Sequence, residues 1–112
     1  MVERRKSEVW NGKMTVQKET FIRRSISEAL RRAGWDVTYH LQGLGSRKGF
    51  PDLTAMKDGK TVYIEIKTET GRQSDYQKEF ERICTNHGCK YILARSVNDI
   101  VELLNFKPLF EA

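Results

Sequence analysis

The first regular pattern along the chain is helical. Between residues 16 and 33 the apolar side chains recur every three or four positions; they are Ile22, Ile26, Ala29, Leu30 and Ala33. Thr15 is a possible N-cap, and Gly34 is a natural C-terminal stop. The pattern predicts an amphipathic helix over residues 16–33, preceded by a polar N-terminal arm formed by residues 1–14.

Later segments have patterns that are typical of strands. Residues 35–41 alternate apolar with polar side chains, and residues 91–94 form a short apolar run. Residues 53–56 and 61–67 are two further strand-like runs, separated by Asp58-Gly59, a strong signal for a two-residue hairpin turn. The sequence therefore predicts four strands, of which the second and third are antiparallel neighbours.

Two more helices complete the predicted order of elements. Ser74 stands three residues before Gln77, which is the spacing of a capping box, and it opens a helix that extends to about His87. A closing helix is predicted over residues 97–104, and the apolar tail behind it contains Phe106, Leu109 and Phe110. The order α-β-β-β-α-β-α predicts an α/β fold, a mixed four-stranded sheet flanked by helices, in one domain over residues 15–112.

The composition narrows the class of protein. The 112 residues are enough for one hydrophobic core, and they contain neither an apolar run long enough to cross a membrane nor a recognisable secretory signal, so we expect a cytoplasmic protein. The net charge is +5, and residues 1–32 contain nine Lys or Arg against four Asp or Glu. A basic N-terminal third suits a polyanion such as nucleic acid, although a well-solvated basic surface explains the charge equally well.

Two opposite charges lie inside the third predicted strand. Alternate side chains of a strand share a face, so Glu65 and Lys67 lie on one face, and a strand covered by helices on both sides should be apolar on both. Burying charge is costly unless it is paired or bound to a metal. Counting back from the hairpin turn brings Asp52, ahead of the second strand, towards Glu65. Two such carboxylates can bind a hard cation, and Lys67 can position a water molecule for hydrolysis of a phosphodiester.

The triplet Glu-x-Lys alone is also explained by a surface hairpin with an ion pair across one face. The combination of segments is more specific: "GFPDL" at residues 49–53, "YIEIK" at 63–67 and "GRQSDYQ" at 71–77. In this order they resemble the PD-(D/E)xK nucleases and, more narrowly, the virus-type replication-repair nuclease (VRR-NUC) domain, whose compact stand-alone members occur in phages. The resemblance covers about residues 19–104.

The resemblance implies a restriction-endonuclease-like α/β core and a DNA endonuclease that depends on Mg²⁺ or Mn²⁺, without a small-molecule organic cofactor. A phage origin would place the protein in the cytoplasm of a bacterial host. The implied metal ligands are Asp52, Glu65 and the backbone carbonyl of Ile66; Lys67 would assist catalysis and Gln77 would lie beside the site. Gln77 is equally well explained as part of a capping box with Ser74, and the two roles can coexist.

The resembled family also has an acidic residue on its first helix, for which Glu19 and Glu28 compete. At about 100° per residue, Glu19 falls about 20° from Ile26, on the inward face, whereas Glu28 falls about 200° away. This spacing favours Glu19 as the additional metal ligand.

The substrate is the least specified part of the prediction. Arg47, Lys48 and Arg72 flank the motif and are placed to contact phosphates, although each is equally explained as a solvated loop charge. Stand-alone members of the resembled family imply a homodimer and branched DNA, such as a Holliday junction, in DNA repair or replication. A flap or nicked-DNA nuclease, and a basic nucleic-acid-binding module without catalysis, are the alternatives.

Overall fold

The structure, a computed structural model, describes residues 11–43 and 45–105, with side chains from residue 18 onward. Most of the predicted N-terminal arm and the whole of the apolar tail therefore lie outside the described residues. Among the described residues, no helix is both long and apolar enough to span a membrane.

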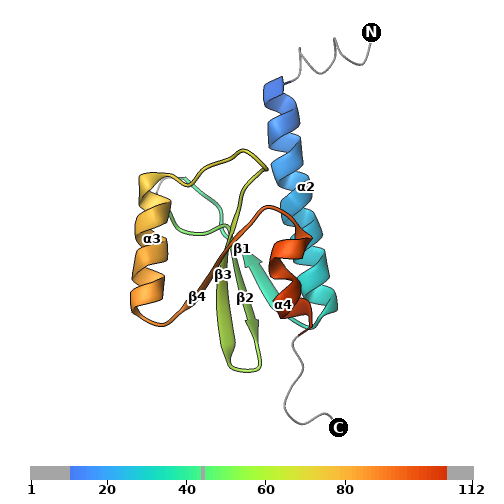
Figure 1. Ribbon diagram of the computed structural model, residues 1–112, viewed down its shortest axis with the longest axis vertical. Helices are drawn as coiled ribbons and strands as arrows, with labels where there is room; N and C mark the ends of the chain where they lie inside the picture. Colours follow the sequence, from blue (N-terminus) through green and yellow to red (C-terminus); the bar gives the residue numbers. More distant parts are fainter. Residues whose placement is uncertain (1–10, 44, 106–112) are drawn as a thin grey trace.

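A mixed four-stranded sheet forms the centre of the molecule, as the sequence predicts (Figure 1). The strands lie in the order β1-β2-β3-β4; β1 and β3 are antiparallel to β2, and β4 is parallel to β3. The strands are β1 (Asp36–Tyr39), β2 (Leu53–Lys57), β3 (Lys60–Ile66) and β4 (Lys90–Ala94).

Helices cover both faces of this sheet. In Figure 1 the long helix α2 lies with α4 on one side of the strands, and α3 lies on the other. The helices are α2 (Asn11–Arg32), α3 (Asp75–Asn86), the 3₁₀ turn η1 (Val97–Ile100) and α4 (Val101–Leu104). The α/β fold and the order of its elements are thus confirmed.

The start of the first helix differs from the prediction. Helix α2 includes Asn11, so residues 11–14 are not an arm and Thr15 is not an N-cap. A single helical glycine, here Gly12, costs only about 1 kcal/mol relative to alanine, so the helix continues through it. The predicted end is correct: Gly34 has φ +95°, and the N–H of Trp35 donates to the carbonyl of Leu30 over 2.9 Å. This is a Schellman motif, which satisfies the last carbonyls of the helix.

The first strand is shorter than predicted. Its pairing with β2 ends where Tyr39 meets Leu53, and Leu41 is 77% exposed. Apolar and polar side chains alternate to residue 41, but β1 is an edge strand of the sheet and its regular pairing stops at Tyr39. Alternation in the sequence therefore overstates the length of this strand.

The two faces of β3 are buried against different groups. On one face Val62, Ile64 and Ile66 belong to the core that contains Ile26 and Leu30 of α2. On the other face, aromatic rings pack edge to face or tilted beneath α3; they belong to Phe50, Tyr63, Phe80 and Tyr91. Glu65, on this second face of β3, is therefore removed from water.

Candidate active site

The hairpin sets the register that builds the site. Asp58 and Gly59 both have positive φ, 48° and 81°, as a two-residue turn of type I′ requires. The tight turn pairs Leu53 with Ile64, so the residue before Leu53 lies opposite the residue after Ile64. Asp52 and Glu65 are these two residues, which confirms that the hairpin brings them together.

Glu65 is a buried carboxylate with one satisfied oxygen. The residue is 2% exposed, and its Oε2 accepts a hydrogen bond from Gln77 Nε2 at 2.8 Å and lies 3.6 Å from Lys67 Nζ. Its Oε1 is buried and has no hydrogen-bond partner among the described residues. Such an oxygen costs about 1–3 kcal/mol or more. The carboxyl group at this position is therefore retained at an expense to the fold.

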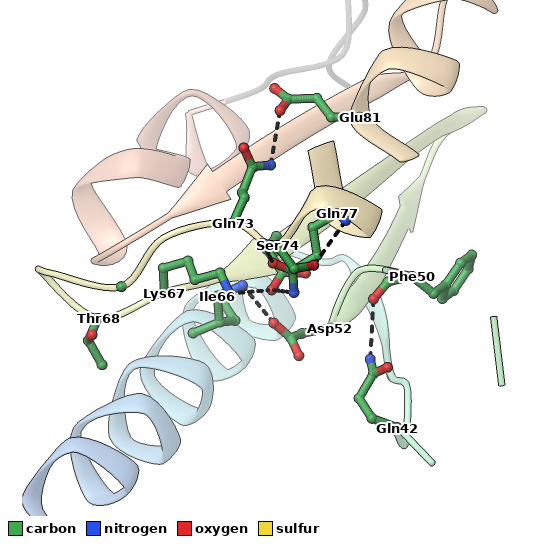
Figure 2. A network of polar contacts seen from close by, with 12 residues as sticks. Gln42, Phe50, Asp52, Ile66, Lys67, Thr68, Gln73, Ser74, Gln77 and Glu81 are labelled. Carbon is green, nitrogen blue, oxygen red and sulfur yellow. Dashed lines mark hydrogen bonds and ion pairs between the residues drawn. The ribbon is translucent and has the colours of Figure 1, made fainter. Parts of the chain in front are cut away.

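Asp52 contributes the second carboxylate and fixes the end of β3. Its Oδ2 accepts a hydrogen bond from the backbone N–H of Ile66 over 2.8 Å. Figure 2 shows Asp52, Lys67 and Gln77 gathered around this end of the strand. The site therefore combines a strand end, the residue ahead of its hairpin partner and the first turn of α3.

The environment of Glu65 favours its protonated form when no cation is present. Burial raises its pKa from the ordinary value of 4.5 to about 8, and the negative charge of Asp52 adds to the increase. Lys67 acts in the opposite direction, because its positive charge lowers the pKa of Glu65. One lysine does not compensate for burial and a second carboxylate, so the net effect is to disfavour the ionised form of Glu65.

A hard divalent cation fits this donor set. The unpartnered Oε1 of Glu65 and the carboxylate of Asp52 are the oxygen ligands that Mg²⁺ and Mn²⁺ prefer. The described residues contain no group of three His, Cys, Asp or Glu side chains that could hold a metal. Mg²⁺ commonly uses one or two protein carboxylates, with water and substrate phosphate as its other ligands, so a pair is sufficient.

Gln77 has both of the roles that the sequence left open. Its Oε1 accepts from the backbone N–H of Ser74 over 2.8 Å, while Ser74 Oγ accepts from the backbone N–H of Gln77 over 3.2 Å. This reciprocal pair is a capping box at the start of α3. The same amide donates its Nε2 hydrogen to Glu65. One side chain thus caps the helix and holds the buried carboxylate.

The loop before Asp52 is pressed against the same turn of α3. Gly49 has φ +81°, and a Cβ there would collide with the backbone carbonyl of Tyr76 and lie 2.8 Å from the nitrogen of Gln77. Only glycine allows this approach. It brings the guanidinium of Arg47 over the Phe80 ring, 5.0 Å from its centroid, and Lys48 Nζ over the Tyr76 ring at 5.1 Å.

Other predicted residues lie outside this cluster. Arg72 is exposed on the loop between β3 and α3, and Arg47 and Lys48 are exposed as well. Glu19 and Glu28 are both exposed on α2, which covers the sheet face opposite Glu65. A side chain of α2 can therefore approach the site only around the end of the sheet.

No sequence pattern indicated the role of Arg95. Its Nη1 donates to the carbonyls of Thr68 at 2.6 Å, Gly71 at 2.8 Å and Glu69 at 3.3 Å. These carbonyls belong to the loop that joins Lys67 to α3. Arg95 thus fixes the path between the lysine and the helix of Gln77, although it lies more than 20 residues away in the sequence.

The sheet, its helices and the group formed by Asp52, Glu65 and Lys67 together have the layout of a PD-(D/E)xK nuclease domain. The model of the VRR-NUC domain family matches residues 3–98, so the chain belongs to this family of nuclease-type domains. A solved structure described as a VRR_NUC domain has the same fold, with a TM-score of 0.67, 22% sequence identity, and coverage of 81% of this chain and 98% of that chain. None of the curated proteins compared with the chain is a significant match.

Proposed function

We propose that this protein is a metal-dependent endonuclease that hydrolyses phosphodiester bonds of DNA, with branched DNA such as a four-way junction as its substrate. The observation that carries the proposal is Glu65, a buried carboxylate with an unpartnered oxygen beside Asp52 and Lys67. Membership of the VRR-NUC family supports a nuclease.

Asp52, Glu65 and the backbone carbonyl of Ile66 would hold Mg²⁺ or Mn²⁺. When bound, such an ion supplies Lewis-acid chemistry, because it polarises the phosphoryl oxygens and increases the acidity of water. Glu19 remains the proposed additional ligand, which would have to reach the site around the end of the sheet. The protein's contribution is a donor set fixed by Gln77 and by the hydrogen bond between Asp52 and Ile66.

Lys67 is the residue placed to act on the reacting groups. Its side chain is 15% exposed, and its ammonium lies 3.6 Å from Glu65 Oε2, so it is held at the site yet accessible from solvent. From there it can orient the attacking water and stabilise negative charge that develops on the phosphate. Gln77 keeps Glu65 in place and leaves its Oε1 without a hydrogen bond from any residue in the described part of the chain.

The proposed preference for branched DNA rests on charge and symmetry. Arg47 and Lys48, on the loop packed against α3, and Arg72, on the loop after β3, can contact phosphates, but phosphate contacts carry no base-sequence information. A two-fold homodimer would bring two equivalent sites to two strands of a junction, which is a geometric reason for paired nicks.

The test is a cleavage assay with wild type, Lys67→Ala and Asp52→Asn on an end-labelled four-way junction and a linear duplex of matched length, with Mn²⁺. We expect paired nicks near the junction from wild type alone, inhibited by chelator. Binding without cleavage by all three proteins would favour the non-catalytic binding module. Flap and nicked DNA serve as further controls. If either is cut in preference to the junction, the protein remains a nuclease but its proposed substrate is wrong.

A further inference from the structure

A cleft of about 590 Å³ lies beside the candidate active site, on the α2 side of the sheet. One wall is α2, through Lys18, Phe21 and Ile22; the other is formed by the loops that follow β3 and β4, through Thr68 and Arg95 among others. In Figure 1 both loops come to α2 at the end of the sheet from which they leave. The volume is within the range of sites that bind small molecules or single groups of a larger ligand.

The cleft borders the chain segment that follows Lys67, and this wall is held in place. Thr68 directly follows Lys67, so the chain that carries the lysine also lines the cleft. Arg95 holds that wall in place through its hydrogen bonds to the carbonyls of Thr68, Glu69 and Gly71. A DNA strand that reaches Lys67 therefore has an adjoining, preformed hollow.

The lining combines an aromatic ring with positive charge. Phe21 is 68% exposed, which is unusual for phenylalanine, and the apolar Ile22 lies beside it. Lys18 and Arg95 supply two cations against one carboxylate, that of Glu69, among the described lining residues. Exposed aromatic rings beside cations are the combination with which proteins bind single-stranded nucleic acid, because bases stack on the ring while cations follow the backbone.

We propose that this cleft binds one unpaired nucleotide of the DNA strand next to the scissile phosphate, with its base stacked on Phe21 and its phosphate near Lys18. The inference rests on the proposed function in that it takes DNA as the ligand. A paired base cannot enter, because its face is covered by the duplex stack. The cleft thereby gives the protein a reason to prefer branched DNA, whose strands separate at the branch, over continuous duplex.

The experiment compares Phe21→Ala and Phe21→Trp in the Lys67→Ala background, which permits binding without cleavage. The probes are a forked DNA with unpaired arms and a fully paired duplex of the same length, each with Mn²⁺. Phe21→Ala should weaken binding of the fork by about 5- to 150-fold, the range for loss of one stacked base, and binding of the duplex by less than about twofold. Phe21→Trp should retain fork binding, and 2-aminopurine in an unpaired arm should be quenched by the Trp variant and not by the Ala variant.

Met56→Ala is the matched control, since Met56 is 45% exposed on β2 and does not line the cleft. Unchanged fork binding by Phe21→Ala, or equal losses on fork and duplex, would overturn the inference. A change of oligomeric mass in Phe21→Ala would also overturn it, because Phe21 would then be a protein–protein contact. Cleavage by the protein with Lys67 intact is measured separately. Selective fork binding without cleavage would refute the proposed function while supporting the cleft.

Discussion

Replacing Glu65 by glutamine is expected to stabilise the metal-free protein at alkaline pH. Glutamine keeps the shape of the side chain and an oxygen that can accept from Gln77, but it carries no charge. In wild type the carboxylate is buried beside Asp52, and these two causes raise its pKa to about 8. The folded state therefore retains a proton on Glu65 at pH values where the unfolded chain has released it.

The sign and size of the effect follow from this difference. Between pH 4.5 and about 8 the folded state binds more protons than the unfolded state, so the free energy of unfolding decreases as pH rises. Each pKa unit is worth about 1.4 kcal/mol, which gives an upper limit of about 5 kcal/mol for the loss. The Glu65→Gln variant has no carboxyl group at this position, so it does not lose stability in this way as pH rises. The two proteins should have similar stability at pH 5, and the variant should be the more stable one at pH 9.

Urea unfolding in the presence of chelator, at pH 5, 7 and 9, measures this difference. Subtracting the unfolding free energy of the variant from that of wild type cancels the titration of other groups. A difference of about 2 kcal/mol in unfolding free energy moves the unfolding midpoint by about 1 M urea. Saturating Mn²⁺ should reduce the disadvantage of wild type at pH 9, because an ion at 100 times its Kd stabilises wild type by about 2.7 kcal/mol and the variant much less. A constant difference across pH would refute the raised pKa, and equal Mn²⁺ effects would refute Glu65 as a ligand.

Three further predictions address the elements that hold the site. Gln77→Ala should lower the unfolding free energy by about 1–3 kcal/mol and reduce cleavage, because it removes a hydrogen bond to Glu65 as well as the cap. Ser74→Ala should lower the unfolding free energy by about 1 kcal/mol and largely retain cleavage. Urea unfolding and initial cleavage rates distinguish the two variants. Gly49→Ala should destabilise the protein by more than 1 kcal/mol in the same unfolding assay, since the backbone of α3 occupies the space of the new methyl group. Arg95→Ala should lower kcat, and added guanidinium should partly restore kcat; a rise in KM with kcat unchanged, or no rescue, contradicts its role in positioning the loop.

The sequence predicted the parts of the site that depend on local geometry. A two-residue turn at Asp58-Gly59 allows one register, so the opposition of Asp52 and Glu65 can be counted from the turn without knowledge of the rest of the fold. The capping box is equally local, because both of its hydrogen bonds join Ser74 to Gln77, three residues later. In both cases the chain between the two residues is too short for a second arrangement.

The parts that could not be predicted depend on how distant segments pack. Arg95 reaches the loop after β3 only because β4 lies parallel to β3, which brings Ala94 to Ile66 and lets the carbonyl of Ala94 accept from the N–H of Lys67. No spacing in the sequence predicts this contact between Arg95 and the loop. The helical period places Glu19 at a known angle around α2, but it does not show which face of the sheet α2 covers. It covers the face opposite Glu65, so an inward angle alone does not place Glu19 at the site.

The capping box also explains why one oxygen of Glu65 has no hydrogen-bond partner within residues 11–43 and 45–105. Because the amide oxygen of Gln77 accepts from the N–H of Ser74, the orientation of that amide is fixed by the helix end, and its Nε2 faces Glu65. The amide reaches Oε2 alone, and Lys67 lies against the same oxygen. Both protein partners thus converge on one side of the carboxylate and leave Oε1 as the side available to a cation. Folding of the first turn of α3 and orientation of the candidate metal ligand are therefore a single structural event.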